Sequence, residues 1–260
     1  SVLLQNYPNL EYIIMDGGST DNSVEIIRKY EAWLAYWVSE KDSGQSNAIN
    51  KGFMLSTGEI MGWLNSDDSY NKNALSKIAI IFDNKDEFNW LVGATYIINK
   101  EGKLLKIQHS PDPISNKTFF LYQKYWIPQP STFWNRKIWQ QSGPLSEDLN
   151  YVMDVDLFFN FFLKNQPKIT QYLISFYRQH NTSKTVGQQE KSNKEFVDWF
   201  VKKFFITDSV TIQGKQFSYR DIINELVLFE INLNRISNHF IIGNLIKFWK
   251  KYVNRSFNVL

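Results

Sequence analysis

The chain of 260 residues contains no cysteine, and this absence excludes disulfide bonds, thiolate zinc sites and cysteine nucleophiles. It also fits a reducing compartment, so we expect a cytoplasmic protein. The net charge of only +3 gives no reason to expect nucleic acid as a partner. No run of about 18 uncharged apolar residues occurs, so the sequence predicts no transmembrane helix. The first residues also lack the pattern of a signal peptide.

Apolar side chains, in contrast, are abundant enough for a sizeable core. Hydrophobic residues make up 43% of the chain and aromatic residues 16%. This length fits one large domain or a domain with an appendage. Aromatic rings also stack on sugars and bases, but we expect most of these rings to lie in the core.

The first third of the chain alternates short apolar runs with helical patterns. We expect strands at 10–15, 36–39 and 59–64, with helices beginning after Asn22 and Asp42 and another helix over 71–82. Asn22, followed three residues later by a glutamate, predicts a capping box. This alternation of strands and helices predicts an α/β fold with a mostly parallel sheet flanked by helices.

Acidic residues follow each of these three strands. Because the carboxyl ends of parallel strands share one edge of a sheet, we expect Asp16, Asp42, Asp67 and Asp68 to meet there. Crowding two like charges is costly unless a cation neutralises them. The Asp67–Asp68 pair therefore predicts a site for a hard divalent metal and, through it, a phosphate. The alternative is a solvated acidic turn.

The loop at 16–21 reads Asp-Gly-Gly-Ser-Thr-Asp and joins the first strand to a helix. Glycines let a ligand approach the backbone, and a helix N-terminus favours anions. The carboxylate of Asp16 could accept hydrogen bonds from a ribose hydroxyl or a base N–H. The loop has neither the Walker pattern nor the dinucleotide fingerprint. The alternative is an Asx turn before a capped helix.

The second part of the chain has a different pattern. We expect a hairpin of strands 90–98 and 103–109, a short helix near 115–122, a strand at 131–134, a helix over 135–141, a helix just after Asp154 and a strand at 171–178. The polar segment 183–192 is expected to be mobile, and 195–205 to be helical.

Two carboxylates at the start of one of these helices are candidates for the general base. Asp154 and Asp156 are two positions apart, and such residues do not face the same way on a helix. We favour Asp154 as the base, because one carboxylate should enter the site while the other caps the helix or pairs with a cation. Farther along, Arg178 and Lys184 could neutralise a diphosphate, and His180 could bind metal or a phosphate oxygen. A histidine with a structural role is the alternative.

The last part of the chain has the pattern of a helical extension. Apolar residues repeat at four-three spacing over 222–240, which is typical of an amphipathic helix. Segment 238–260 mixes aromatic and basic residues, and such mixtures can lie on an anionic membrane surface. An ordinary packed helix with a solvated basic face is the alternative. We therefore divide the chain into a domain of residues 1–185 and a helical C-terminal extension of residues 186–260.

Five segments, in this order, resemble motifs of family 2 glycosyltransferases: 16–21, 40–45, 63–68, 129–131 and 153–157. Their spacing is similar to that of bacterial members that build surface polysaccharides of the cell envelope, and the resemblance covers roughly residues 1–185. It implies a Rossmann-like GT-A fold and an inverting, metal-dependent enzyme of the hexosyltransferase type. The donor would be a nucleotide-sugar, by family habit a UDP-sugar, and the acceptor a hydroxyl of a glycan or lipid-linked saccharide.

The resemblance also implies roles for individual residues. Asp16 would contact the nucleotide base or ribose, and Asp42 would border the same pocket. Asp67 and Asp68 would form the DxD-like element that holds Mn²⁺ or Mg²⁺. Asp154 would deprotonate the acceptor. Residues assigned to the donor site from their places in these motifs are Gly17, Ser19, Asp21, Gln45 and Asn65. An Arg-x-His segment lies near the diphosphate in some members, which implies Arg178 as a further donor contact and His180 as a further metal ligand.

The chain departs from the family pattern at two places. Its first residues resemble the end of the family's first helix, so the first strand is expected to be missing. Asn65 stands where some members have a third acid. A truncated, non-catalytic nucleotide- or carbohydrate-binding domain is one alternative. A sugar-phosphate nucleotidyltransferase is another, although that class would need a glycine-rich basic loop near the start, which this chain lacks.

Overall fold

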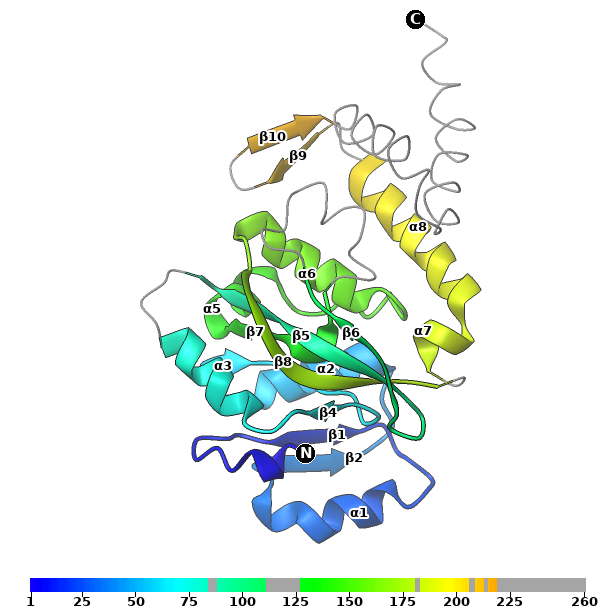
Figure 1. Ribbon diagram of the computed structural model, residues 1–260. Helices are drawn as coiled ribbons and strands as arrows, with labels where there is room; N and C mark the ends of the chain where they lie inside the picture. The colour runs from blue at the N-terminus through cyan, green and yellow to red at the C-terminus, as the bar shows by residue number, and fades with distance from the viewer. Residues whose placement is uncertain (84–87, 111–126, 181–182, 206–208, 213–214, 219–260) are drawn as a thin grey trace, which may run out of the picture.

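The computed structural model describes residues 1–83, 88–110, 127–180, 183–205, 209–212 and 215–218 (Figure 1). The helices are α1 (Ser23–Tyr30), α2 (Gln45–Leu55), α3 (Ala74–Asp83), α5 (Arg136–Ser142), α6 (Met153–Lys164), α7 (Lys184–Gly187) and α8 (Gln189–Phe205). The strands are β1 (Ile13–Asp16), β2 (Tyr36–Ser39), β3 (Ile60–Met61), β4 (Ser69–Tyr70), β5 (Trp90–Asn99), β6 (Leu104–Gln108), β7 (Thr132–Asn135), β8 (Lys168–Gln179), β9 (Ser209–Ile212) and β10 (Lys215–Ser218).

A six-stranded sheet in the order β3-β7-β5-β8-β4, with β6 on β5, forms the centre of the fold. β1 and β2 form a separate parallel pair, which lies beside α1 at one end of the molecule (Figure 1). The expected α/β architecture is confirmed, and so is the β5–β6 hairpin. The expectation of mostly parallel pairing is wrong in the central sheet. There only β5 and β8 run parallel, whereas β3–β7, β5–β7, β5–β6 and β4–β8 are antiparallel.

Two apolar clusters cover the faces of the central sheet. On one face Phe158 of α6 stacks on Trp90 and Trp63 and meets the edge of Trp134, and α2 and α5 join the same cluster. On the other face Ile78 of α3 packs with residues of β5, β7 and β8. Many of the aromatic rings thus form the core, as their number suggested.

β3 is shorter than the predicted strand at 59–64. It pairs only Ile60 and Met61 with β7. Two residues beyond the strand, the carbonyl of Trp63 accepts a hydrogen bond from the Gln129 side chain at 2.8 Å. A Cβ on Gly62 would lie 2.8 Å from the ring of Phe133, so glycine lets the chain cross closely over this residue. Beyond β3, the Gln129 side chain therefore takes the place of a strand partner for the backbone. The chain then enters the loop 65–68, which carries Asp67 and Asp68 and is called the acidic loop below.

Two local predictions are also corrected. Asn22 occupies the N-cap of α1, but its side chain makes no capping hydrogen bond. The Asp21 carboxylate accepts a bond from Ser23 N instead, at 2.9 Å. The segment 183–192, expected to be mobile, forms α7 and the first turn of α8. α8 holds its place because Phe196 and Trp199 belong to the larger core cluster. The domain boundary at 185/186 stays a prediction.

Three predictions lie outside the described residues. These are the short helix near 115–122, the amphipathic pattern over 222–240 and the basic–aromatic segment 238–260, together with the membrane contact inferred from it. In the part of the chain that the structure describes, no helix combines the length and the apolar character needed to cross a bilayer.

Candidate active site

The loop after β1 is organised around the carboxylate of Asp16. Its Oδ2 accepts hydrogen bonds from Gly18 N, Ser19 N and Ser39 Oγ, at 3.1, 2.9 and 2.6 Å. Burial acts to raise the pKa of Asp16, but a hydrogen bond from Ser19 Oγ to Asp16 Oδ1, together with the bonds to Oδ2, outweighs it and holds the pKa below its usual value. Asp16 is therefore an ionised anchor of this loop, which ends at Asp21 and the start of α1.

The loop after β2 lies directly against the first loop. A Cβ on Gly17 would stand only 2.5 Å from Asp42 Oδ2, so the close approach of the two loops requires glycine at position 17. The other oxygen of Asp42 accepts a hydrogen bond from Gly44 N at 2.8 Å, immediately before α2 begins at Gln45. The structure therefore brings the Asp16 and Asp42 loops together, as the sequence predicted.

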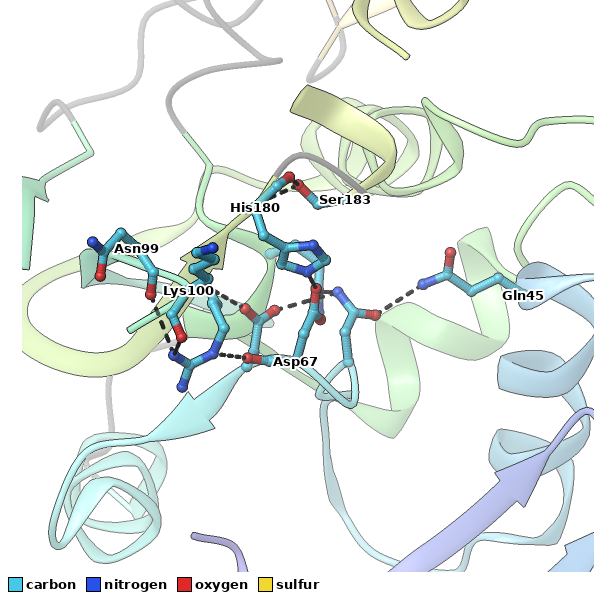
Figure 2. Close-up of polar contacts among 10 residues, drawn as sticks. Gln45, Asp67, Asn99, Lys100, His180 and Ser183 are labelled. Atoms are coloured by element: carbon cyan, nitrogen blue, oxygen red, sulfur yellow. Dashed lines mark hydrogen bonds and ion pairs between the residues drawn. The ribbon is translucent and has the colours of Figure 1, made fainter. Parts of the chain in front are cut away.

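Gln45 connects these two loops to the acidic loop. Its Nε2 donates to Asn65 Oδ1 at 2.9 Å, and Figure 2 shows this side chain reaching from α2 toward the acidic residues. Asn65 also donates to Gln129 Oε1 at 3.1 Å and to Asp68 Oδ2 at 3.4 Å. The acidic loop is therefore joined to the Asp16 and Asp42 loops by the Gln45 side chain. The strands before these loops do not belong to one parallel sheet, contrary to the prediction from the sequence.

The two adjacent carboxylates differ in their surroundings. Asp68 is only 8% exposed, whereas the Asp67 side chain is 34% exposed. Burial raises the pKa of Asp68 to about 7, and the neighbouring charge of Asp67 acts in the same direction. A hydrogen bond from Arg178 N to Asp68 Oδ1, at 2.9 Å, opposes this shift. The loop thus carries one solvated carboxylate and one that is costly to ionise.

β8 ends against this acidic loop. Arg178 donates from Nε to the carbonyl of Asp67 at 3.0 Å, and from Nη1 to the carbonyls of Asn99 and Lys100 at 3.3 and 3.1 Å. His180 Nε2 lies 3.0 Å from Asp67 Oδ2 and points toward it (Figure 2). Arg178 therefore ties the β5–β6 turn to the acidic loop, and its predicted contact with a diphosphate stays a prediction.

The donor atoms around Asp67 and Asp68 fit a hard divalent cation. Carboxylate oxygens suit Mg²⁺ and Mn²⁺, an imidazole suits Mn²⁺, and a cation would relieve the cost of ionising buried Asp68. The described residues contain no complete cluster of three or more acidic, histidine or cysteine ligands. That is compatible with Mg²⁺-type binding, in which one or two carboxylates share the ion with substrate phosphates and water.

The family can be identified from the sequence profile described as Glycosyl transferase family 2, which matches residues 1–142. The chain belongs to this family. A glycosyltransferase of Rickettsia prowazekii, described as uncharacterized, is 26% identical to this family 2 member over 238 residues, which is 88% of the chain and 73% of the relative. A similarly described glycosyltransferase of Nostoc sp. is 34% identical over 89 residues, which is 33% of the chain and 28% of the relative.

Solved structures show the same fold. Staphylococcus aureus TarS superposes with a TM-score of 0.62 at 15% identity, over 91% of this chain and 40% of TarS. A mannosyltransferase from Pyrobaculum calidifontis, PcManGT, superposes with a TM-score of 0.59 at 12% identity, over 98% of this chain and 76% of that protein. The GT-A architecture is thereby confirmed. The chain spans less than two thirds of the length of the Nostoc relative and of TarS.

The candidate base of this family 2 glycosyltransferase lies in the first turn of α6 rather than just before the helix. Asp154 follows Met153, whose Sδ contacts Ser46 Oγ beside Gln45. Asp156 is held elsewhere, because its Oδ1 accepts bonds from Trp199 Nε1 and Lys203 Nζ at 2.7 and 2.8 Å. The expectation that one carboxylate pairs with a cation is confirmed for Asp156.

The sequence singled out the motif at 129–131 and Lys184, but it did not reveal the contacts that Gln129 and Lys184 make. Gln129 is buried and joins Trp63 to Asn65. Lys184 donates to Gln45 Oε1 at 2.9 Å rather than standing alone as a cation for phosphate. Together with Gln45, Asn150 and Met153, Lys184 lines a small depression at the first turns of α2, α6 and α7. Segment 129–131 resembled a family motif, but nothing in the sequence indicated which atoms Gln129 would contact.

Proposed function

We propose that this chain is an inverting, metal-dependent glycosyltransferase that moves a sugar from a UDP-sugar to a hydroxyl of a glycan or lipid-linked acceptor in polysaccharide biosynthesis. The observation that carries the proposal is the continuous set of contacts from the Asp16 and Asp42 loops, through Gln45 and Asn65, to the two adjacent carboxylates. A nucleotide and its diphosphate could lie along this set of residues.

The donor side assigns separate tasks to separate loops. Asp16, Gly17, Ser19, Asp21 and Asp42 would receive the base and ribose, because their loops are in contact and are ordered by carboxylate–backbone bonds. A TarS structure is in complex with UDP, and the PcManGT structure is in complex with GDP-mannose and Mn²⁺. These complexes support a nucleotide-sugar donor, and UDP is proposed here from the habit of the family.

Asp67, Asp68 and His180 would hold Mn²⁺ or Mg²⁺ on the donor diphosphate. The bound cation would stabilise the negative charge that develops on the departing diphosphate. Arg178 would contribute by holding the Asp67 carbonyl, which fixes the backbone of the acidic loop. Asn65 would keep Asp68 in place from the other side.

Asp154 would take the proton from the acceptor hydroxyl as that oxygen attacks the anomeric carbon. A hydroxyl is a poor nucleophile until a positioned base removes its proton. Attack from the face opposite the leaving group inverts the anomeric centre, so one carboxylate is sufficient, unlike the two of a retaining hydrolase. The engagement of Asp156 with α8 supports Asp154 rather than Asp156 in this role.

The test is nucleotide release from UDP-, GDP- and dTDP-sugars with a panel of acceptors, in Mn²⁺, Mg²⁺ or EDTA, together with calorimetry of nucleotide binding. We expect metal-dependent UDP release by the wild type. Asp68→Ala should lose both binding and release. Asp154→Asn should bind UDP normally but turn over about 10² to 10⁴ times more slowly. Asp83→Asn, at an exposed position on α3, is the matched control.

The alternatives give different results in the same experiment. Metal-dependent nucleotide binding with no release across the panel would favour a non-catalytic binding domain. Pyrophosphate release from a nucleoside triphosphate and a sugar phosphate would indicate a nucleotidyltransferase. A nucleotide affinity that changes neither on removal of the metal nor in Asp68→Ala would refute the proposed donor site. The cytoplasmic location and the membrane contact of segment 238–260 stay predictions.

A further inference from the structure

One face of α8 is aligned with α6 and with the segment that precedes it. Glu195, Trp199 and Lys203 recur at four-residue spacing, which places them on one side of the helix. Trp199 Nε1 and Lys203 Nζ bind Asp156 of α6, at 2.7 and 2.8 Å. The Trp199 ring also packs edge-on against Phe159, with 5.7 Å between the centroids. α8 is therefore fixed in both position and rotation along α6.

The third residue of this face, Glu195, binds backbone rather than a side chain. Its Oε1 accepts hydrogen bonds from the N–H groups of Asn150, Tyr151 and Val152, at 3.0, 2.6 and 3.0 Å, and its Oε2 lies 3.1 Å from Asn150 N. Three consecutive amides thus converge on one carboxylate. Such a charge-assisted arrangement near a helix N-terminus is favourable, and it has strict geometric requirements.

The backbone held by Glu195 leads directly into α6. Val152 is the N-cap of this helix, and Asp154 is its second residue. The same segment is also held by Ser46 Oγ, which donates to Leu149 O at 3.3 Å, and by Lys184 Nζ, which donates to Asn150 O at 3.4 Å. Together with these two contacts, Glu195 therefore fixes the backbone that leads into α6.

We propose that Glu195 is a positioning residue for the reaction, acting through the backbone of 150–152 on the placement of Asp154. This inference rests on the proposed function, because it takes Asp154 as the base. A displacement of about 1 Å of a reacting group can reduce the rate on the order of a hundredfold. Glu195 lies on α8 and outside the nucleotide loops, so its loss should affect turnover and leave donor binding intact.

The experiment compares Glu195→Ala and Glu195→Gln in the full chain, with Glu190→Ala, an exposed change on the same helix, as control. Glu195→Ala should lower kcat about tenfold to a hundredfold. The Kd for UDP with Mn²⁺ should stay within about twofold. Hydrogen exchange of a peptide covering 150–152 should become faster. Glu195→Gln keeps an acceptor oxygen at Oε1, so it should retain more of the wild-type kcat and more of the protection. Glu190→Ala should change none of these.

Different outcomes separate the inference from the function on which it rests. Unchanged kcat in both Glu195 variants, with an active wild type, would overturn the positioning role and leave the proposed function standing. Unchanged exchange at 150–152 would show that the carboxylate does not hold this backbone, and would also overturn it. A wild type that transfers no sugar would refute the proposed function first, and the positioning role with it. If Glu195→Ala does not fold, the comparison of Glu195→Gln with wild type decides.

Discussion

Replacing Asp68 by asparagine should stabilise the metal-free protein at alkaline pH while abolishing metal-dependent nucleotide binding. The carboxyl is 8% exposed, and its burial raises its pKa from 3.8 to about 7. A carboxyl with a raised pKa in the folded state favours folding while it is protonated. That contribution is lost as the pH rises from the unfolded value to the folded one. Asparagine has nearly the same shape and carries no charge to desolvate.

The size of the effect follows from the two pKa values, 3.8 unfolded and about 7 folded. At about 1.36 kcal/mol per pKa unit, the raised pKa of Asp68 costs the folded state about 1.7 kcal/mol at pH 5 and about 4.3 kcal/mol at pH 8. The stability advantage of Asp68→Asn should therefore grow by about 2.5 kcal/mol over this range. For a chain of this size that is about 5 to 10 °C in Tm. If Asp68→Asn also lost the 3.4 Å contact with Asn65, the stability of the variant would change by the same amount at pH 5 and at pH 8.

The assay is chemical denaturation of both proteins in EDTA at pH 5 and pH 8, followed by titration with UDP and Mn²⁺. Asp83→Asn reports the effect of removing an exposed carboxylate. UDP with Mn²⁺ should raise the stability of the wild type at pH 8 and leave Asp68→Asn unchanged. If the stability difference between wild type and Asp68→Asn is the same at both pH values, the buried carboxyl does not destabilise the fold as the pH rises, which would refute the prediction.

Three further predictions concern the loops and the core. Gly17→Ala should weaken UDP binding about tenfold by calorimetry with little change in Tm, since its Cβ would displace the Asp42 carboxylate; unchanged affinity would contradict a shared nucleotide pocket. Trp134→Ala should lower the free energy of unfolding by about 3–5 kcal/mol in a urea titration. Trp134→Phe should cost far less, because the buried indole N–H has no hydrogen-bond partner in the described part of the chain. Burial acts to raise the pKa of Glu11, but hydrogen bonds from the 57–58 turn lower it. Glu11→Gln should therefore destabilise at pH 7 and have little effect near pH 3 in thermal scans; equal losses at both pH values would be inconsistent with this shift.

Elements specified by local patterns were predictable. β2 has the expected bounds, because an apolar run followed by glycine or polar turn residues indicates a strand by itself. β1 ends one residue after its expected end and starts three residues after its expected start. Neither strand is fully buried. The acidic pair at 67–68 could also be identified, because the two carboxylates are adjacent in the sequence. Their unequal burial was not visible, because it depends on β8, which arrives more than a hundred residues later.

Features that depend on distant partners escaped prediction. β3 pairs only two residues with β7, and beyond it the carbonyl of Trp63 binds the side chain of Gln129, more than sixty positions away. The polar segment that forms the start of α8 gave no apolar signal of its own, and that helix is held instead by rings that pack against α6. The direction of the Arg178 guanidinium, toward three carbonyls, follows from the register between β5 and β8, which no local pattern encodes.

The long separation between the acidic loop and its partners has a consequence during protein synthesis. Asp68 and Arg178 are 110 positions apart, and Asp67 and His180 are 113 apart. A ribosome adds about 5 to 20 residues per second, so the loop waits on the order of 5 to 20 s for these contacts. Until β8 has emerged, a nascent chain therefore lacks the contacts that orient both carboxylates, and a product that stops before β8 never gains them.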